Sequence, residues 1–142
     1  MLSALGGRPW RRTRICTPAI RNIAAAMARH GVKRIVVMST LGAGDTRADV
    51  GAIARRLLFG LVLRNEVADK EAMERHLEST GLDWTVVRVG LLNDGVSRGK
   101  FRAADDHSIR GMGKIARADV AAFMLAQLTS DAWQRRKPVL VY

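Results

Sequence analysis

Two adjacent hydroxyl residues, Ser39 and Thr40, stand directly after an apolar β-branched run of the kind that forms a buried strand. A hydroxyl at a strand end can donate a hydrogen bond to a carbonyl or a phosphate oxygen. Two other strand ends carry glycine, at Gly6–Gly7 and Gly90–Leu92, and glycine lets a ligand approach the backbone closely. Since ligands of parallel α/β sheets bind beyond the carboxyl ends of the strands, these segments predict one shared site. The alternative is that the glycines serve tight turns and the hydroxyls cap them.

The elements that position these residues alternate between strand and helix. Four short apolar runs predict parallel strands covered on both faces, and these runs begin at Leu2, Ile35, Trp84 and Val139. Between or after them, residue patterns predict helices over 17–30, 52–63, 66–80 and 119–128. Thr17 and Asp119 are expected to cap the helices that they begin, and Gly31 to end the first helix. Alternation through short loops predicts an α/β fold with a parallel sheet.

Composition narrows the class of protein. The 142 residues suffice for one domain, and one cysteine, Cys16, excludes an internal disulfide. The three histidines lack metal-ligand spacing, and no apolar stretch has the length of a membrane span. The net charge of +11 favours anionic small molecules, but without interleaved aromatic residues it predicts no specific nucleic-acid partner. A cytoplasmic protein without a metal site is expected.

Three ordered stretches resemble one family over nearly the whole chain: RNIAAAMARHGVKRIVVMST, DKEAMERHLESTGLDWTVVRVGLL and IARADVAAFML. The sequence is similar to the atypical short-chain dehydrogenase/reductases, and most to the NAD(P)H-binding proteins related to NmrA and to the biliverdin-IXβ/flavin reductases. This resemblance implies a Rossmann-type, doubly wound parallel sheet. It also implies NADP or NAD as cofactor and a small-molecule acceptor.

The cofactor-binding residues implied by the resemblance lie at two strand ends. The group that lines the dinucleotide cleft consists of Ala4, Leu5 and Gly6. The group beside the nicotinamide consists of Arg88, Val89, Gly90 and Leu91. The family usually has proline after the arginine, where this chain has Val89, so a different loop geometry is expected. The alternative for Arg88 is an arginine paired with a carboxylate beneath the sheet, because a buried arginine needs a partner.

The catalytic residues implied by the resemblance are Ser39, Thr40 and Lys70. The resemblance implies that one of the two hydroxyls faces the nicotinamide or the substrate, and that Lys70 takes the place of a lysine that contacts the nicotinamide ribose in many relatives. Glu66 replaces the tyrosine of the family's Tyr-x-x-x-Lys pair, so ordinary alcohol–ketone chemistry is not expected. Flavin reductases work without that tyrosine, since hydride transfer needs cofactor and acceptor held face to face. The alternative for Lys70 is an i,i+4 pair with Glu66 on a solvated helix face.

The family's glycine-rich phosphate loop has no counterpart here, and Gly42–Gly44 does not replace it because no clear helix with a third glycine follows. The chain is therefore expected to be a single partial Rossmann-like domain, 1–142, shortened at its N-terminus. The predicted function is that of an NAD(P)H-binding reductase of the flavin/biliverdin type, with cofactor binding weak or lost. The alternatives are a misassigned start codon and a non-catalytic NmrA-like binding module or partner-dependent fragment. An exposed sheet edge would favour self-association.

Overall fold

A computed structural model describes residues 1–7, 14–51 and 63–142. Its main sheet contains four parallel strands within those ranges, in spatial order β1 (Leu2–Ser3), β2 (Arg34–Thr40), β3 (Asp83–Val89) and β7 (Val139–Val141). A further strand, β5 (Arg102–Ala104), pairs antiparallel with β7 at one edge. All four strands predicted from apolar runs are thus confirmed, and they are parallel as expected.

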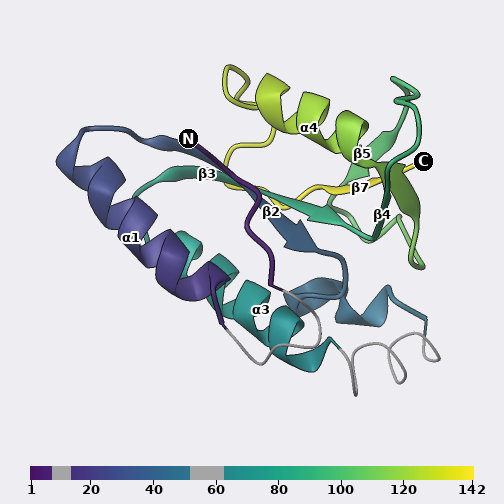
Figure 1. The fold of residues 1–142 in the computed structure, drawn as a ribbon, viewed down its shortest axis with the longest axis horizontal. Helices are drawn as coiled ribbons and strands as arrows, with labels where there is room; N and C mark the ends of the chain where they lie inside the picture. Colours follow the sequence, from purple (N-terminus) through teal and green to yellow (C-terminus); the bar gives the residue numbers. More distant parts are fainter. Residues whose placement is uncertain (8–13, 52–62) are drawn as a thin grey trace.

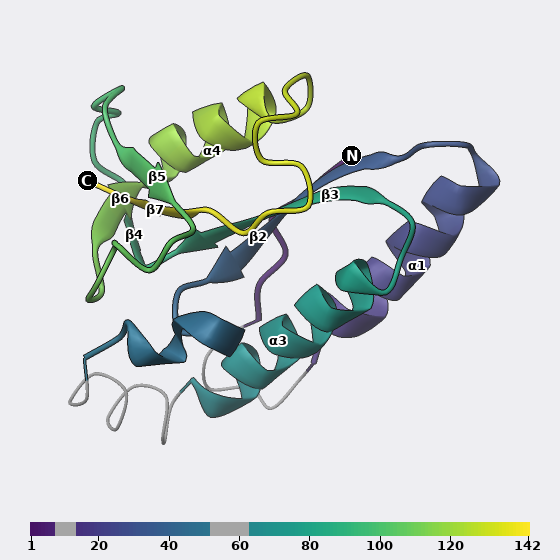
Figure 2. The same cartoon turned by 180° about the vertical axis from the view of Figure 1, so that it is seen from behind.

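Helices cover both faces of this sheet, as in a doubly wound fold. α1 (Cys16–Arg29) and α3 (Arg64–Glu78) lie on one face, and α4 (Arg117–Ala126) lies on the other (Figures 1 and 2). A short 3-10 turn, η1 (Gly44–Ala48), follows β2. A small parallel ribbon pairs β4 (Leu91–Asn93) with β6 (Lys114–Ala116). The predicted helix over 52–63 lies, except for Leu63, outside the described residues.

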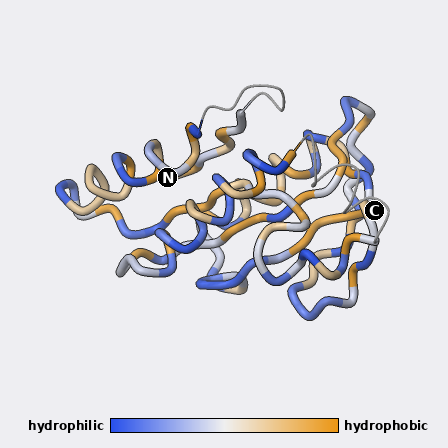
Figure 3. The backbone as a smooth tube through the Cα atoms, turned by 90° about the horizontal axis from the view of Figure 1, so that it is seen from below, coloured by the Kyte–Doolittle hydropathy of each residue, from blue (hydrophilic) through white to orange (hydrophobic). Residues whose placement is uncertain are grey.

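The core has one layer on each side of the sheet, because successive strand residues point to opposite faces. Ile35 and Val37 of β2 pack toward α1 and α3, whereas Val36 between them packs toward α4. Figure 3 shows hydrophobic segments through the middle of the molecule and hydrophilic segments at its periphery. None of the described helices has the length and apolar character needed to cross a membrane.

The start of α1 differs from the prediction. The helix begins at Cys16, so Thr17 is not its N-cap, and the side chain of Asp69 in α3 takes over that role. The Asp69 carboxylate accepts hydrogen bonds from the backbone N–H groups of Ile15, Cys16 and Thr17 at 2.8–3.1 Å. Burial acts to raise the pKa of Asp69, but these bonds and the Thr17 hydroxyl outweigh it and lower that pKa. The predicted end of α1 is confirmed: Gly31 has φ +66°.

The predicted cap of α4 is also wrong. This helix begins at Arg117, and Asp119 lies inside its first turn, where its side chain holds a distant loop and the last strand. The donors to its carboxylate are the Ser97 and Tyr142 hydroxyls and the backbone N–H groups of Arg98 and Gly99. The bonds from Ser97 and Tyr142 are the main causes that hold the pKa of Asp119 far below its usual range. Asp119 therefore fixes the loop that follows β4.

Candidate functional site

Lys70 joins the carboxyl ends of two neighbouring strands. Its ammonium donates to the backbone carbonyl of Leu5, just beyond β1, at 2.5 Å and to that of Met38 in β2 at 2.8 Å. The side chain comes from α3 and only 2% of the residue is exposed. The alternative of a solvated surface pair with Glu66 is therefore wrong, and Lys70 lies at the strand edge where the sequence predicted a ligand site.

The two hydroxyl residues differ in their surroundings. Ser39 is 2% exposed, and its hydroxyl donates to the carboxylate of Glu74 in α3 at 2.6 Å. Thr40 is partly exposed, and its hydroxyl donates to the carbonyl of the adjacent Leu41 at 3.2 Å. Neighbouring strand residues point to opposite faces, which explains this difference. Thr40 is consequently the hydroxyl that solvent can reach, while Ser39 is bound within the protein.

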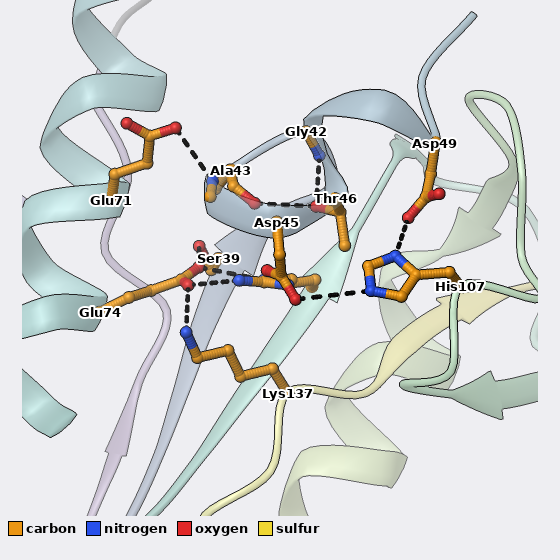
Figure 4. Close-up of polar contacts among 12 residues, drawn as sticks. Ser39, Gly42, Ala43, Asp45, Thr46, Asp49, Glu71, Glu74, His107 and Lys137 are labelled. Carbon is orange, nitrogen blue, oxygen red and sulfur yellow. Dashed lines mark hydrogen bonds and ion pairs between the residues drawn. The ribbon is translucent and has the colours of Figure 1, made fainter.

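Arg88 lies in a buried cluster of charges around Glu74. Its guanidinium donates to the Glu74 carboxylate through Nη2 at 2.7 Å and Nε at 3.3 Å, and Nη1 pairs with Asp45 at 2.6 Å. The Lys137 ammonium contacts the same Glu74 carboxylate at 3.3 Å, and Figure 4 shows Ser39 and Lys137 converging on it. Burial acts to lower the pKa of Arg88, but Glu74 and Asp45 outweigh it and raise that pKa. The alternative of an arginine held by a carboxylate is confirmed.

The remaining predicted cofactor-binding residues share the same edge but differ in exposure. Ala4, Leu5, Gly6 and Leu91 are exposed there, whereas Val89 is 4% exposed and pairs with Thr40 across the strands. Gly90 is required for packing, because a Cβ at this position would lie 2.4 Å from the carbonyl oxygen of Gly113. The β4–β6 ribbon therefore runs close against this strand end.

An apolar cavity of about 260 Å³ adjoins this edge on the α4 face of the sheet. It includes Ala4 from the predicted cleft and Met38, the residue whose carbonyl accepts from Lys70. The other lining residues are Leu92, Arg117, Val120, Ala121 and Met124. The predicted site is thus bordered by polar groups at the strand ends and by an apolar wall beneath α4.

Glu66, at the position of the family's tyrosine, is half-buried in the first turn of α3. Burial raises the pKa of its carboxyl, although the charge of Lys70 opposes this shift. Glu71 lies further along α3. Its carboxylate accepts from the backbone N–H of Gly44 at 2.9 Å and pairs with Arg47 at 3.1 Å. Glu71 therefore connects α3 to η1.

A second cavity, of about 280 Å³, was not anticipated from the sequence. It lies along β3 and β7, with Arg88 in its wall, and is called the charged cavity here. His107, which lines this cavity, donates through Nδ1 to the carboxylate of Asp49 at 2.6 Å, and its Nε2 lies 3.8 Å from Asp45 (Figure 4). The contact with Asp49 raises the pKa of His107.

Glu74 was not predicted as a site residue, although its spacing from Lys70 indicates its position. Glu74 follows Lys70 by four residues, so both side chains lie on the same face of α3. Because Lys70 points at the strand ends, a carboxylate one turn later is also placed against the sheet. Asp45 and His107 carry no such signal, since they come from loops far apart in the chain.

Comparisons with known proteins identify the family and the fold. A family model described as NAD(P)H-binding matches residues 1–131. ChuY, an anaerobilin reductase from Escherichia coli O157:H7, is 25% identical with a TM-score of 0.78; the match covers 99% of this chain and 63% of ChuY. No curated protein sequence matches the chain.

Two less similar structures share the fold alone. A short-chain dehydrogenase/reductase from Veillonella parvula, solved with NADP, is 13% identical with a TM-score of 0.75, and the match covers 99% of this chain and 62% of that one. SP1627 from Streptococcus pneumoniae, provisionally assigned as an NADH-flavin reductase, is 18% identical with a TM-score of 0.74 and coverages of 99% and 70%. The chain thus spans less than two thirds of the length of ChuY.

Proposed function

The chain belongs to the NAD(P)H-binding family, and from this premise we propose that its strand edge holds NADP or NAD for the reduction of a small acceptor. The observation that carries this proposal is the position of Lys70, whose ammonium is buried between the carboxyl ends of β1 and β2. An ammonium has three N–H donors, and two are used by carbonyl groups. Apart from the nearby Cys16 thiol, no described group takes the third, which can donate to a ribose hydroxyl at the edge.

The surrounding residues fit a dinucleotide at this edge. Apart from the chain neighbours of Gly6, no heavy atom of the described residues lies within 4 Å of where its Cβ would stand, so these residues leave room for a ligand beside this backbone. The Thr40 hydroxyl makes only a 3.2 Å bond to a neighbouring carbonyl, and it can turn toward a carboxamide or an acceptor. Lys70 would hold the ribose and Thr40 the carboxamide of a reduced nicotinamide, which would supply a hydride when bound.

The acceptor is proposed to be of the flavin or biliverdin type. Two observations support this class: the similarity to a protein described as an anaerobilin reductase, and the replacement of the family's tyrosine by Glu66. The apolar cavity beneath α4 offers a wall for a planar ring beside Met38. Holding such a ring face to face with the nicotinamide is the main requirement for hydride transfer.

Weak but saturable binding of NADPH is expected for the 142-residue chain, because no glycine-rich turn among these residues holds the pyrophosphate. Thr40→Val should weaken this binding about three- to tenfold, the effect of one lost hydrogen bond. Ser39→Ala is the matched control, since its hydroxyl is bound to Glu74. Fluorescence titration together with saturation-transfer NMR measures both variants.

Two results would speak against this assignment. No saturable binding by the folded chain contradicts a dinucleotide site at this edge. A larger loss for Ser39→Ala than for Thr40→Val contradicts the role given to Thr40. Low-micromolar affinity of the unmodified chain for NADPH would contradict only the prediction that this binding is weak.

A second candidate function, a non-catalytic binding module that self-associates, is favoured by the edge of β1. In the described part of the chain this two-residue strand pairs only with β2, and Met1 and Leu5 beside it are 47% and 41% exposed. Sedimentation equilibrium should then show a mass that rises with concentration above 15.6 kDa. The rise should be stronger at high salt, which screens the repulsion of +11 charges. A monomer at every concentration and salt level excludes this candidate.

A further inference from the structure

We propose that the charged cavity binds a small oxyanion, a carboxylate or phosphate group, which takes the place of Asp45 on the guanidinium of Arg88. Arg88 is 1% exposed and lies in the wall of this cavity of about 280 Å³. Its two carboxylate partners belong to different elements, and they differ in how firmly they are held. This difference makes one of them exchangeable.

Glu74 is the permanent partner of Arg88. Its side chain is 3% exposed, and beyond Arg88 it is held by the Ser39 hydroxyl at 2.6 Å and the Lys137 ammonium at 3.3 Å. It occupies the edge of the guanidinium formed by Nε and Nη2. A carboxylate with this many buried donors leaves its place only at a high energetic cost.

Asp45 is the exchangeable partner. Its side chain is 57% exposed, and its only close ionic contact among the described residues is Nη1 of Arg88 at 2.6 Å. The second cationic neighbour, Nε2 of His107, is 3.8 Å away. The carboxylate is carried by η1, a turn of five residues, instead of a long helix or a strand of the sheet.

The backbone of η1 lies directly against the guanidinium of Arg88. A Cβ built on Gly44 would lie 3.4 Å from Nη2 of Arg88, and Gly44 has φ +57°. η1 is fastened to the rest of the protein by Glu71, through the N–H of Gly44, and by the contact of Asp49 with His107. The side chains of Glu71 and Asp49 are 17% and 9% exposed, against 3% for Glu74. The backbone N–H of Gly111 also donates to the Asp49 carbonyl at 2.8 Å.

Charge balance defines the class of the ligand. When Asp45 withdraws, Arg88 and Lys137 share the carboxylate of Glu74, while Lys137 also contacts Glu78. The guanidinium face at Nη1 is then a buried cation without a partner, which is unfavourable unless another anion arrives. A planar or tetrahedral oxyanion matches the N–H donors of arginine, whereas a neutral or cationic ligand does not restore the balance.

The test compares Asp45→Asn with Asp94→Asn, using inorganic phosphate and acetate as separate probes and sodium chloride at matched ionic strength as the reference. Asp94 is the matched control because its side chain is 88% exposed and pairs with an exposed arginine, Arg117. The readout is the Nε–Hε NMR signal of Arg88 during titration. We expect Asp45→Asn to bind at least one of the two anions about tenfold more tightly than the unmodified chain, as one charge-assisted hydrogen bond predicts, and Asp94→Asn to match the unmodified chain.

Each outcome bears on the proposal. Saturation by phosphate alone assigns a phosphate-bearing ligand, and saturation by acetate alone assigns a carboxylate. Equal affinity of both variants, or a shift that chloride reproduces, overturns the proposal and indicates general screening. If circular dichroism shows that Asp45→Asn is unfolded, the titration is carried out on the unmodified chain. The absence of a saturable shift of its Arg88 signal at high concentrations of phosphate and of acetate then also overturns the proposal. No dinucleotide is present, so these results stand apart from the proposed reductase site.

Discussion

Replacing Glu74 with alanine is expected to lower the free energy of unfolding by about 3–5 kcal/mol, the cost of leaving a buried charge without its partner. Arg88 is 1% exposed and would keep only the exposed carboxylate of Asp45, and the Ser39 hydroxyl would lose its acceptor. Urea denaturation followed by circular dichroism measures the change. We therefore expect Glu74 to contribute more to stability than a surface carboxylate of α3 does.

Glu71→Ala is the control for this prediction. Glu71 lies on the same helix and also pairs with an arginine, but Arg47 is 59% exposed. Exposed pairs contribute about 0–1 kcal/mol, so Glu71→Ala should change the stability little. An equal effect of both substitutions would show that the buried cluster adds nothing beyond an ordinary surface pair. The double replacement Glu74→Leu with Arg88→Met should recover part of the loss, since it removes both charges.

The second large effect is expected for Lys70→Met. This change removes the donor to the Met38 carbonyl inside the sheet, which costs about 1.5–3 kcal/mol for one charge-assisted hydrogen bond. The Leu5 carbonyl belongs to an exposed residue and can be hydrated instead. The backbone of residues 4–6 should then become mobile, and the weak binding of NADPH should be lost. Urea denaturation, amide hydrogen exchange and NADPH titration measure these three effects.

Lys100→Met serves as the control, because Lys100 is exposed. It removes the same charge from the chain, so it separates the local role of Lys70 from the general attraction of a cationic protein for an anionic ligand. Unchanged stability and exchange in Lys70→Met would mean that the two carbonyl contacts do not hold the edge together.

The sheet could be predicted from local sequence because its signals are local. Ile35–Met38 and Trp84–Val89 are continuous apolar runs, and the short connections before them favour parallel pairing on a helical crossover. The two strands of the β4–β6 ribbon were not predicted. Each contains three residues, and their pairing depends on contacts between Leu91–Asn93 and the distant Lys114–Ala116. Such short strands have no periodicity to detect.

The polar part of the site was less predictable. Asp119 and Thr17 have the residue types of helix caps, but tertiary partners compete for their side chains, and the caps are not formed. Lys70 and Glu74 lie on a helix rich in charged residues, where exposure is the ordinary expectation for each. Their burial follows from groups that only the folded chain brings near. The family resemblance, and not the residue pattern, pointed to Lys70.

Lys70 and Glu74 also restrict how the protein can move. They lie one helical turn apart on α3 and bind two consecutive residues of β2. Lys70 donates to the carbonyl of Met38, and Glu74 accepts from the hydroxyl of Ser39. Sliding α3 by one turn, about 5.4 Å, would set a carboxylate against a carbonyl oxygen, which repels it. Shear between α3 and the sheet is therefore blocked. We therefore expect α3 and β2 to move as one rigid body, and access to the charged cavity to change through motion of η1 instead.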